Sequence, residues 1–226
     1  MKTLINCIII LILFSGCENK LRNKNQKFEY NYFENGELKS YISDKEEKFG
    51  VEVLFNDNHQ LELVGHFANN RPLGYVSYYY KNQQIGLRQC IIIDGEPYVN
   101  QYWGFDASGN VDRDFSNFFS ISSSSDTVSV NQEWEIEIKL DCPYLQKNMN
   151  VVFGDYNENY ELRDSSSLVT VEGDDFVVKH KFLFPSKGIK IVRGYIDNYE
   201  FLSIKKGDVR GRSRMNFFKK RVVVVD

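Results

Sequence analysis

The sequence predicts an all-β fold in two parts, a sheet of repeated β-hairpins followed by a β-sandwich. The chain of 226 residues holds 17 Phe and 14 Tyr but only four Pro, and aromatic side chains favour half-buried, pleated surfaces. A motif of an aromatic residue and a turn recurs between residues 28 and 119, and strict alternation of apolar and charged residues follows at 134–140. With 42% hydrophobic residues, the chain can bury a sizeable core.

The first 17 residues form a short apolar segment that ends at a cysteine. Lys2 supplies a positive charge, residues 4–14 are apolar apart from Asn6, and the small pair at 15–16 precedes Cys17. This segment is too short to span a bilayer of roughly 30 Å. It resembles a bacterial lipoprotein signal. The resemblance implies cleavage after Gly16, acylation of Cys17 with palmitate-type chains, and anchoring in the cell envelope, for which we expect the outer membrane. A secretory signal with an incidental cysteine is the alternative.

Residues 17–27 are predicted to form a flexible tether, because 18–27 are polar with a single Leu and no periodicity. Removal of residues 1–16 would take away Lys2 and no acidic residue, so the net charge would change from −3 to −4. This mild acidity gives no case for nucleic acid as a partner.

Residues 28–119 carry an internal repeat. Its copies are YFENGEL at 32–38, FNDNHQL at 55–61, YKNQQI at 80–85 and FDASGNV at 105–111. The aromatic residues Phe33, Phe55, Tyr80 and Phe105 are spaced by 22, 25 and 25 residues. Gly and Asn between apolar residues accept the positive φ of tight β-turns. Each unit is therefore predicted to be one β-hairpin, and successive hairpins are expected to form one long sheet.

The YFENGEL copy and the stretch NNRPLGYVSYYYKNQ at 69–83 resemble the MORN-like repeats of the YwqK-type toxin–antitoxin family. The resemblance implies a MORN-like β-repeat surface that binds a protein partner. An immunity or antitoxin-like protein, or an assembly factor, would fit this role, and neither is an enzyme.

The serine-rich segment at 120–125 is interpreted as a linker, and residues 126–226 are predicted to form the sandwich. At 134–140 apolar residues occupy even positions and charged residues odd ones, which is typical of a half-buried antiparallel strand. Further apolar runs at 149–153, 168–171, 176–184, 188–197 and 217–225 are separated by turn residues. About seven short strands resemble an immunoglobulin-like sandwich in architecture, which carries no function.

An aromatic band in the repeats supplies the candidate partner-binding residues: Tyr78, Tyr79, Tyr80, Tyr102 and Trp103. Exposed rings on a flat sheet can anchor a protein partner. The alternative function is glycan binding for carbohydrate capture, which predicts several rings in one shallow groove beside Asp or Asn. The alternative to both binding functions is that most of these rings are packed in the core of the repeat sheet.

A second candidate surface is the basic patch of Lys205, Lys206, Arg210, Arg212 and Arg214. It could meet anionic lipid headgroups or an acidic partner. The alternative is a solvated hairpin whose charges protect the apolar strand at 222–225 from edge pairing.

The sequence predicts no catalytic site, no cofactor and no metal site. The three histidines lack ligand spacing, and His180 alternates with apolar residues on a strand. The segment 106–114 has oxygen side chains at alternate positions, but Val111 and Asn117 stand where a calcium loop has Gly and Glu. A repeat turn is the preferred interpretation there. Cys90 and Cys142 are either disulfide-bonded or free and buried.

Overall fold

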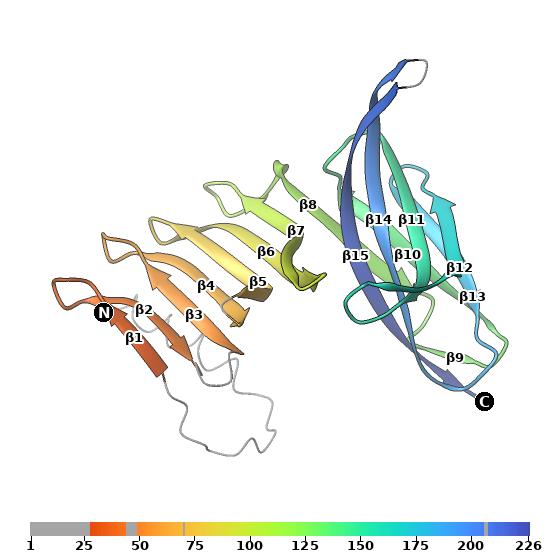
Figure 1. The fold of residues 1–226 in the computed structure, drawn as a ribbon, viewed down its shortest axis with the longest axis horizontal. Coiled ribbons are helices and arrows are strands. Elements are labelled where there is room, and N and C mark those ends of the chain that lie inside the picture. The colour runs from red at the N-terminus through yellow and green to blue at the C-terminus, as the bar shows by residue number, and fades with distance from the viewer. Residues whose placement is uncertain (1–27, 44–48, 70, 206–207) are drawn as a thin grey trace.

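The computed structural model describes residues 28–43, 49–69, 71–205 and 208–226, and all regular structure in them is β (Figure 1). The strands are β1 Phe28–Tyr32, β2 Leu38–Ser43, β3 Phe49–Phe55, β4 Leu61–Ala68, β5 Arg71–Tyr80, β6 Gln83–Ile93, β7 Glu96–Phe105, β8 Val111–Ser123, β9 Thr127–Ser129, β10 Glu133–Cys142, β11 Asn148–Tyr156, β12 Leu162–Glu172, β13 Val177–Leu183, β14 Gly188–Lys205 and β15 Asp208–Val225. The predicted all-β class is confirmed. In these residues no helix has the length and apolar character needed to cross a membrane.

Strands β1 to β8 follow one another in an antiparallel sheet, each paired with its neighbour in sequence. The motif copies form the turns after β1, β3, β5 and β7, and the last residues of these strands are Tyr32, Phe55, Tyr80 and Phe105. The equivalent aromatic of the first unit is therefore Tyr32. The sequence interpretation chose Phe33, which instead begins the turn by donating its N–H to the Glu37 carbonyl.

Three of these turns share one hydrogen-bond pattern. Phe33, Asn56 and Asp106 each donate an N–H to the residue four positions on, and their carbonyls accept from Gly36, His59 and Gly109. The residues that donate to these carbonyls, Gly36, His59 and Gly109, have φ of 84°, 58° and 82°, respectively. Glycine adopts this left-handed backbone freely, which explains the Gly of two copies. The third unit uses a shorter turn with Lys81 and Asn82 at positive φ.

The predicted linker at 120–125 is wrong in its first four residues. Ser120 to Ser123 are the end of β8 and pair with β10, with Ile121 opposite Ile138. Phe119 and Ile121 face the sandwich core, while Ser120 and Ser122 are exposed on the other face. The serine content suggested a loop, but hydroxyls are equally compatible with the solvent face of a strand. One ten-stranded sheet, β1 to β8 then β10 and β13, therefore runs through both parts of the molecule.

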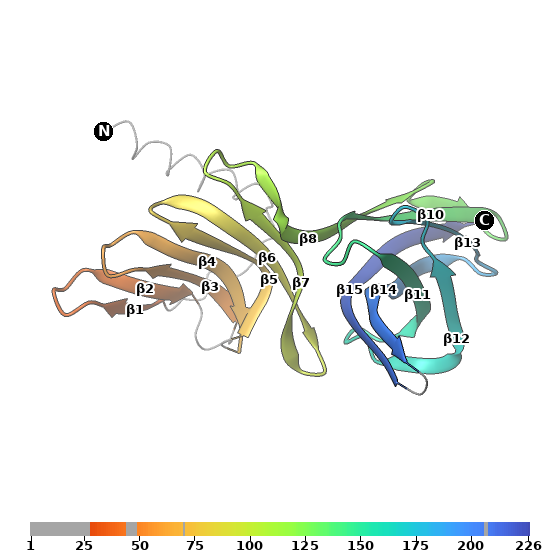
Figure 2. The same cartoon turned by 90° about the horizontal axis from the view of Figure 1, so that it is seen from above.

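The second sheet has the order β12-β11-β14-β15-β9 and packs against β8, β10 and β13 to form a sandwich (Figures 1 and 2). The predicted alternation in β10 is confirmed: Trp134, Ile136, Ile138 and Leu140 are at most 2% exposed. They pack with apolar residues of the other sheet, among them Met149, Val151, Phe153, Ile196, Phe218 and Val222. His180 also lies on this face, with its ring 5.0 Å from that of Phe153.

Buried amides join the repeat sheet to β15. The Asn100 side chain of β7 donates to the Phe217 carbonyl at 2.8 Å and accepts the Phe217 N–H at 2.6 Å. Asn216 donates to Asn117 of β8 at 2.8 Å. The Tyr98 hydroxyl donates to the Met215 carbonyl at 2.6 Å. The two parts therefore meet through directional hydrogen bonds as well as through the shared strand β8.

Candidate functional site

The five predicted partner-binding rings lie on both faces of the repeat sheet. In antiparallel strands, residues directly opposite each other share a face. Tyr78 is opposite Gly86 and Tyr102 is opposite Arg88, so Tyr78, Arg88 and Tyr102 share one face. The Arg88 guanidinium lies 4.5 Å from the centre of the Tyr78 ring and its Nη1 donates to the Tyr78 hydroxyl at 3.3 Å.

Trp103 lies on the opposite face, across from Leu87. Its ring stacks on Phe118 at 5.5 Å and lies 6.2 Å from the ring of Tyr75, which is half exposed. Tyr79 is half-buried opposite Gln84, whereas Tyr80 is 60% exposed. The structure thus separates the five rings into Tyr78 with Tyr102 around Arg88, Trp103 on the other face, and Tyr79 and Tyr80 near the turn.

The Trp103 face carries a continuous row of side chains that the sequence interpretation missed. The cross-strand pairs link Tyr30, Tyr41, Val53, Val64, Ser77, Leu87 and Trp103 in one line across β1 to β7. We call these seven residues the cross-sheet row. A signal was present in the sequence, because alternate members of the row are 23 to 26 residues apart, close to the repeat period. The principal contacts of β1 to β6 are with their hydrogen-bonded neighbours, so in the described chain these strands form a single layer.

The structure shows contacts for two residues of the predicted basic patch, Arg212 and Arg214. Lys205 ends β14, Lys206 lies outside the described residues, and Arg210, Arg212 and Arg214 belong to β15. Arg212 Nε pairs with Glu200 Oε1 at 2.5 Å. The Arg214 guanidinium lies 4.9 Å from the centre of the Tyr98 ring and donates to the Val99 carbonyl. Arg212 is therefore neutralised, and Arg214 helps to hold β15 against the repeat sheet.

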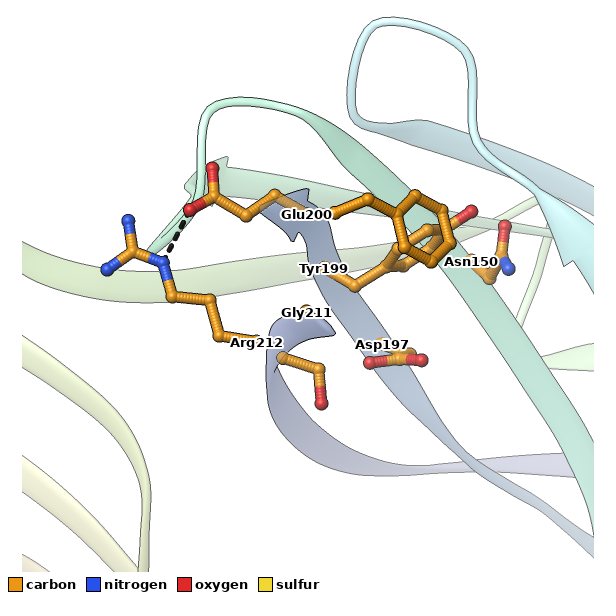
Figure 3. Close-up of a pocket in the computed structure, with 8 residues that line it drawn as sticks. Asn150, Asp197, Tyr199, Glu200, Gly211 and Arg212 are labelled. Atoms are coloured by element: carbon orange, nitrogen blue, oxygen red, sulfur yellow. Dashed lines mark hydrogen bonds and ion pairs between the residues drawn. The ribbon is translucent and has the colours of Figure 1, made fainter. Parts of the chain in front are cut away.

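A shallow pocket lies on the β14–β15 hairpin, and Asn150 of β11 completes its lining (Figure 3). Its volume is about 450 Å³, and its polar lining includes Asp197, Asn150 and the Glu200–Arg212 pair. Tyr199 and Phe201 supply rings whose centres are 5.6 Å apart at 72°. Burial raises the pKa of the Asp197 carboxyl, although a hydrogen bond from Ser213 opposes this rise. Sequence reasoning missed the site because its residues are separated by about 60 positions and become neighbours only through strand pairing.

The other candidate residues are those of the calcium-like segment 106–114, possible metal ligands and the cysteines. Asp106 accepts the N–H groups of Ser108 and Asn110, as expected for a repeat turn, and these hydrogen bonds lower its pKa. The described chain brings no three His, Cys, Asp or Glu side chains together around a metal position. Cys90 and Cys142 are free thiols, and burial raises the pKa of both. Cys17 lies outside the described residues.

Comparison of the chain with models of protein families, with curated proteins and with solved structures finds no match.

Proposed function

We propose that this chain is a lipid-anchored cell-envelope protein without enzymatic activity, whose repeat sheet binds a protein partner. The observation that carries the proposal is the cross-sheet row, because it places six aromatic or aliphatic side chains, interrupted by Ser77 alone, in one line over seven strands. Protein interfaces are enriched in Tyr and Trp, which bury a large area at a low entropic cost.

The partner would lie across the face that carries the row, where Tyr30 and Tyr75 are each 50% exposed. Repeated hairpins put equivalent positions side by side, so an extended partner segment can contact several units at once. The hairpin period supports the resemblance to MORN-like repeats and, with it, an immunity, antitoxin-like or assembly role. An immunoglobulin-like sandwich would serve as the support for this surface.

The test is site-specific photo-crosslinking in the native host, with the photoreactive residue at Tyr75. The matched control position is Ile189, which is 60% exposed on the sandwich strand β14. We expect one discrete crosslinked protein at Tyr75 and none at Ile189. The same crosslinks at both positions, or none at Tyr75, would contradict protein binding by the repeat sheet.

Anchoring is tested separately with Cys17→Ala. Several acyl chains, at about 0.8 kcal/mol per buried CH₂, hold a protein on a membrane more firmly than one chain does. We expect the wild type to sediment with membranes and the variant to be released. A variant that still partitions fully with membranes would exclude Cys17 as the anchor.

A further inference from the structure

We propose that the pocket on the β14–β15 hairpin is a saccharide-binding site in which Asp197 accepts hydrogen bonds from sugar hydroxyls. The site lies on the sandwich, away from the cross-sheet row, and does not depend on the function proposed above. Its volume of about 450 Å³ lies within the roughly 300–1,000 Å³ of small-ligand pockets.

The first argument is an unused acceptor. The Asp197 Oδ1 atom is buried and has no hydrogen-bond partner in the described chain. Native proteins rarely leave a buried carboxylate oxygen unpaired, because the lost hydration is not replaced. Asn150 lies directly opposite Asp197 in the β11–β14 ladder. Its amide can both donate and accept, so the two side chains together match the mixed hydrogen bonding of adjacent sugar hydroxyls.

The second argument is the pair of rings beside these polar groups. Phe201 is 58% exposed, and Gly211 stands opposite it on β15. Since Gly211 has no side chain, no β15 side chain covers the Phe201 ring from that position. An exposed Phe ring on the same strand as the unpartnered Asp197 Oδ1 offers an apolar surface beside a hydrogen-bond acceptor. A pyranose ring presents a C–H face that packs on an aromatic ring and hydroxyl edges that bond to polar side chains.

The third argument is charge. Glu200 and Arg212 neutralise each other at 2.5 Å, and they frame the pocket in Figure 3. Among the lining residues Asp197 is then the carboxylate without a paired cation, so an anionic ligand would be repelled. A neutral, hydroxyl-rich ring fits this balance. An ammonium group would also be attracted to the Asp197 carboxylate and to the neighbouring rings, and it serves as the competing outcome of the test.

The test uses the full chain and an array of neutral malto-, cello-, xylo-, manno- and chito-oligosaccharides. The best binder is then measured by titration calorimetry, with tetramethylammonium as a separate probe. We expect one oligosaccharide class to bind, with affinity reduced about tenfold or more by Asp197→Asn, because the acceptor oxygen becomes a donor. Phe201→Ala should weaken binding to a similar degree. Leu202→Ala is the matched control, since Leu202 is 62% exposed on the same strand and does not line the pocket.

Stability separates a binding role from a structural one. Because the folded protein disfavours the charged form of Asp197, we expect Asp197→Asn to keep or raise the melting temperature while binding is lost. The proposal is overturned if no array member binds the wild type, if tetramethylammonium binds instead, or if Leu202→Ala weakens binding as much as Phe201→Ala does. A fall in melting temperature with Asp197→Asn would also overturn it, because the residue would then serve stability.

Discussion

A chain spanning residues 126–226 should fail to fold stably, although a domain boundary at 120–125 predicts the opposite. Truncation at 126 removes β8, which pairs with β10 inside the sandwich. It also removes the Ser125 carbonyl, which accepts the N–H of the buried Trp134 indole at 2.7 Å. The edge of β10 would then be unpaired and the core open on one side.

The magnitude follows from the lost contacts. Phe119 and Ile121 are partly buried against the sandwich core, so each contributes about 1–2 kcal/mol, less than the roughly 1.5–3 kcal/mol of a fully buried side chain. Five residue pairs of the β8–β10 ladder disappear, and each lost hydrogen bond costs about 0.5–1.5 kcal/mol. The total is roughly 5–11 kcal/mol, which is comparable with the whole stability of a typical domain, about 5–15 kcal/mol.

The assay is urea unfolding followed by tryptophan fluorescence. Trp134 is the single tryptophan after residue 125, and it is fully buried in the intact protein. A chain spanning 96–226 is the control, because it retains β7, β8 and the Asn100–Phe217 hydrogen bonds. We expect a cooperative transition for 96–226 and a broad or absent one for 126–226. Cooperative unfolding of both chains, with free energies within about 1 kcal/mol, would refute the reasoning that β8 completes the sandwich.

Gly194→Ala should destabilise the protein by about 3 kcal/mol or more in chemical denaturation, because the new Cβ would overlap the Val152 carbonyl and lie 2.8 Å from Phe218 Cζ. Burial lowers the pKa of His180, so the folded state favours its neutral form. The melting temperature should therefore fall as the pH drops below about 6.5, and this fall should be smaller in His180→Phe. Cys90 and Cys142 should react slowly with Ellman's reagent in native buffer and rapidly in denaturant, and equal rates would show that they are not buried. Asn100→Ala removes both hydrogen bonds to Phe217. We expect the free energy of unfolding to fall by about 2–4 kcal/mol and small-angle scattering to show a broader distribution of shapes. Asn110→Ala, at an exposed turn, is the control.

The elements that could be predicted from the sequence are those encoded by local patterns. The alternation in β10 depends only on which residues face the core, so Trp134 to Leu140 were assigned correctly. The turns at Gly36 and Gly109 need a positive φ that few residues adopt, and their positions were predicted for the same reason. His59 shows the limit of this rule, because it adopts φ of 58° without being Gly or Asn.

What the sequence could not provide was the pairing of distant strands. Phe119 and Ile121 alternate with serines, as in a strand with one apolar face. The serines nevertheless dominate the composition of 120–125 and suggest a loop. The pocket depends on a register in which Asn150 meets Asp197 and Phe201 meets Gly211. A shift of one residue would turn every one of these side chains to the other face. Binding residues gathered from several strands therefore remain hidden until the register is known.

The Asn100 side chain explains how the repeat sheet can hold a fixed direction relative to the sandwich. Strands β7 and β15 do not form a regular ladder, yet the Asn100 carboxamide pairs with both the N–H and the carbonyl of Phe217, as a strand backbone would. Apolar contacts such as Tyr98 on Phe217, at 5.6 Å, tolerate sliding because they are not directional. Buried amides do not, since a displaced Asn100 would leave polar groups of both strands unpaired. The junction therefore links the cross-sheet row and the β14–β15 pocket in one rigid frame, so that a partner on one surface and a ligand on the other would be held in constant relative orientation.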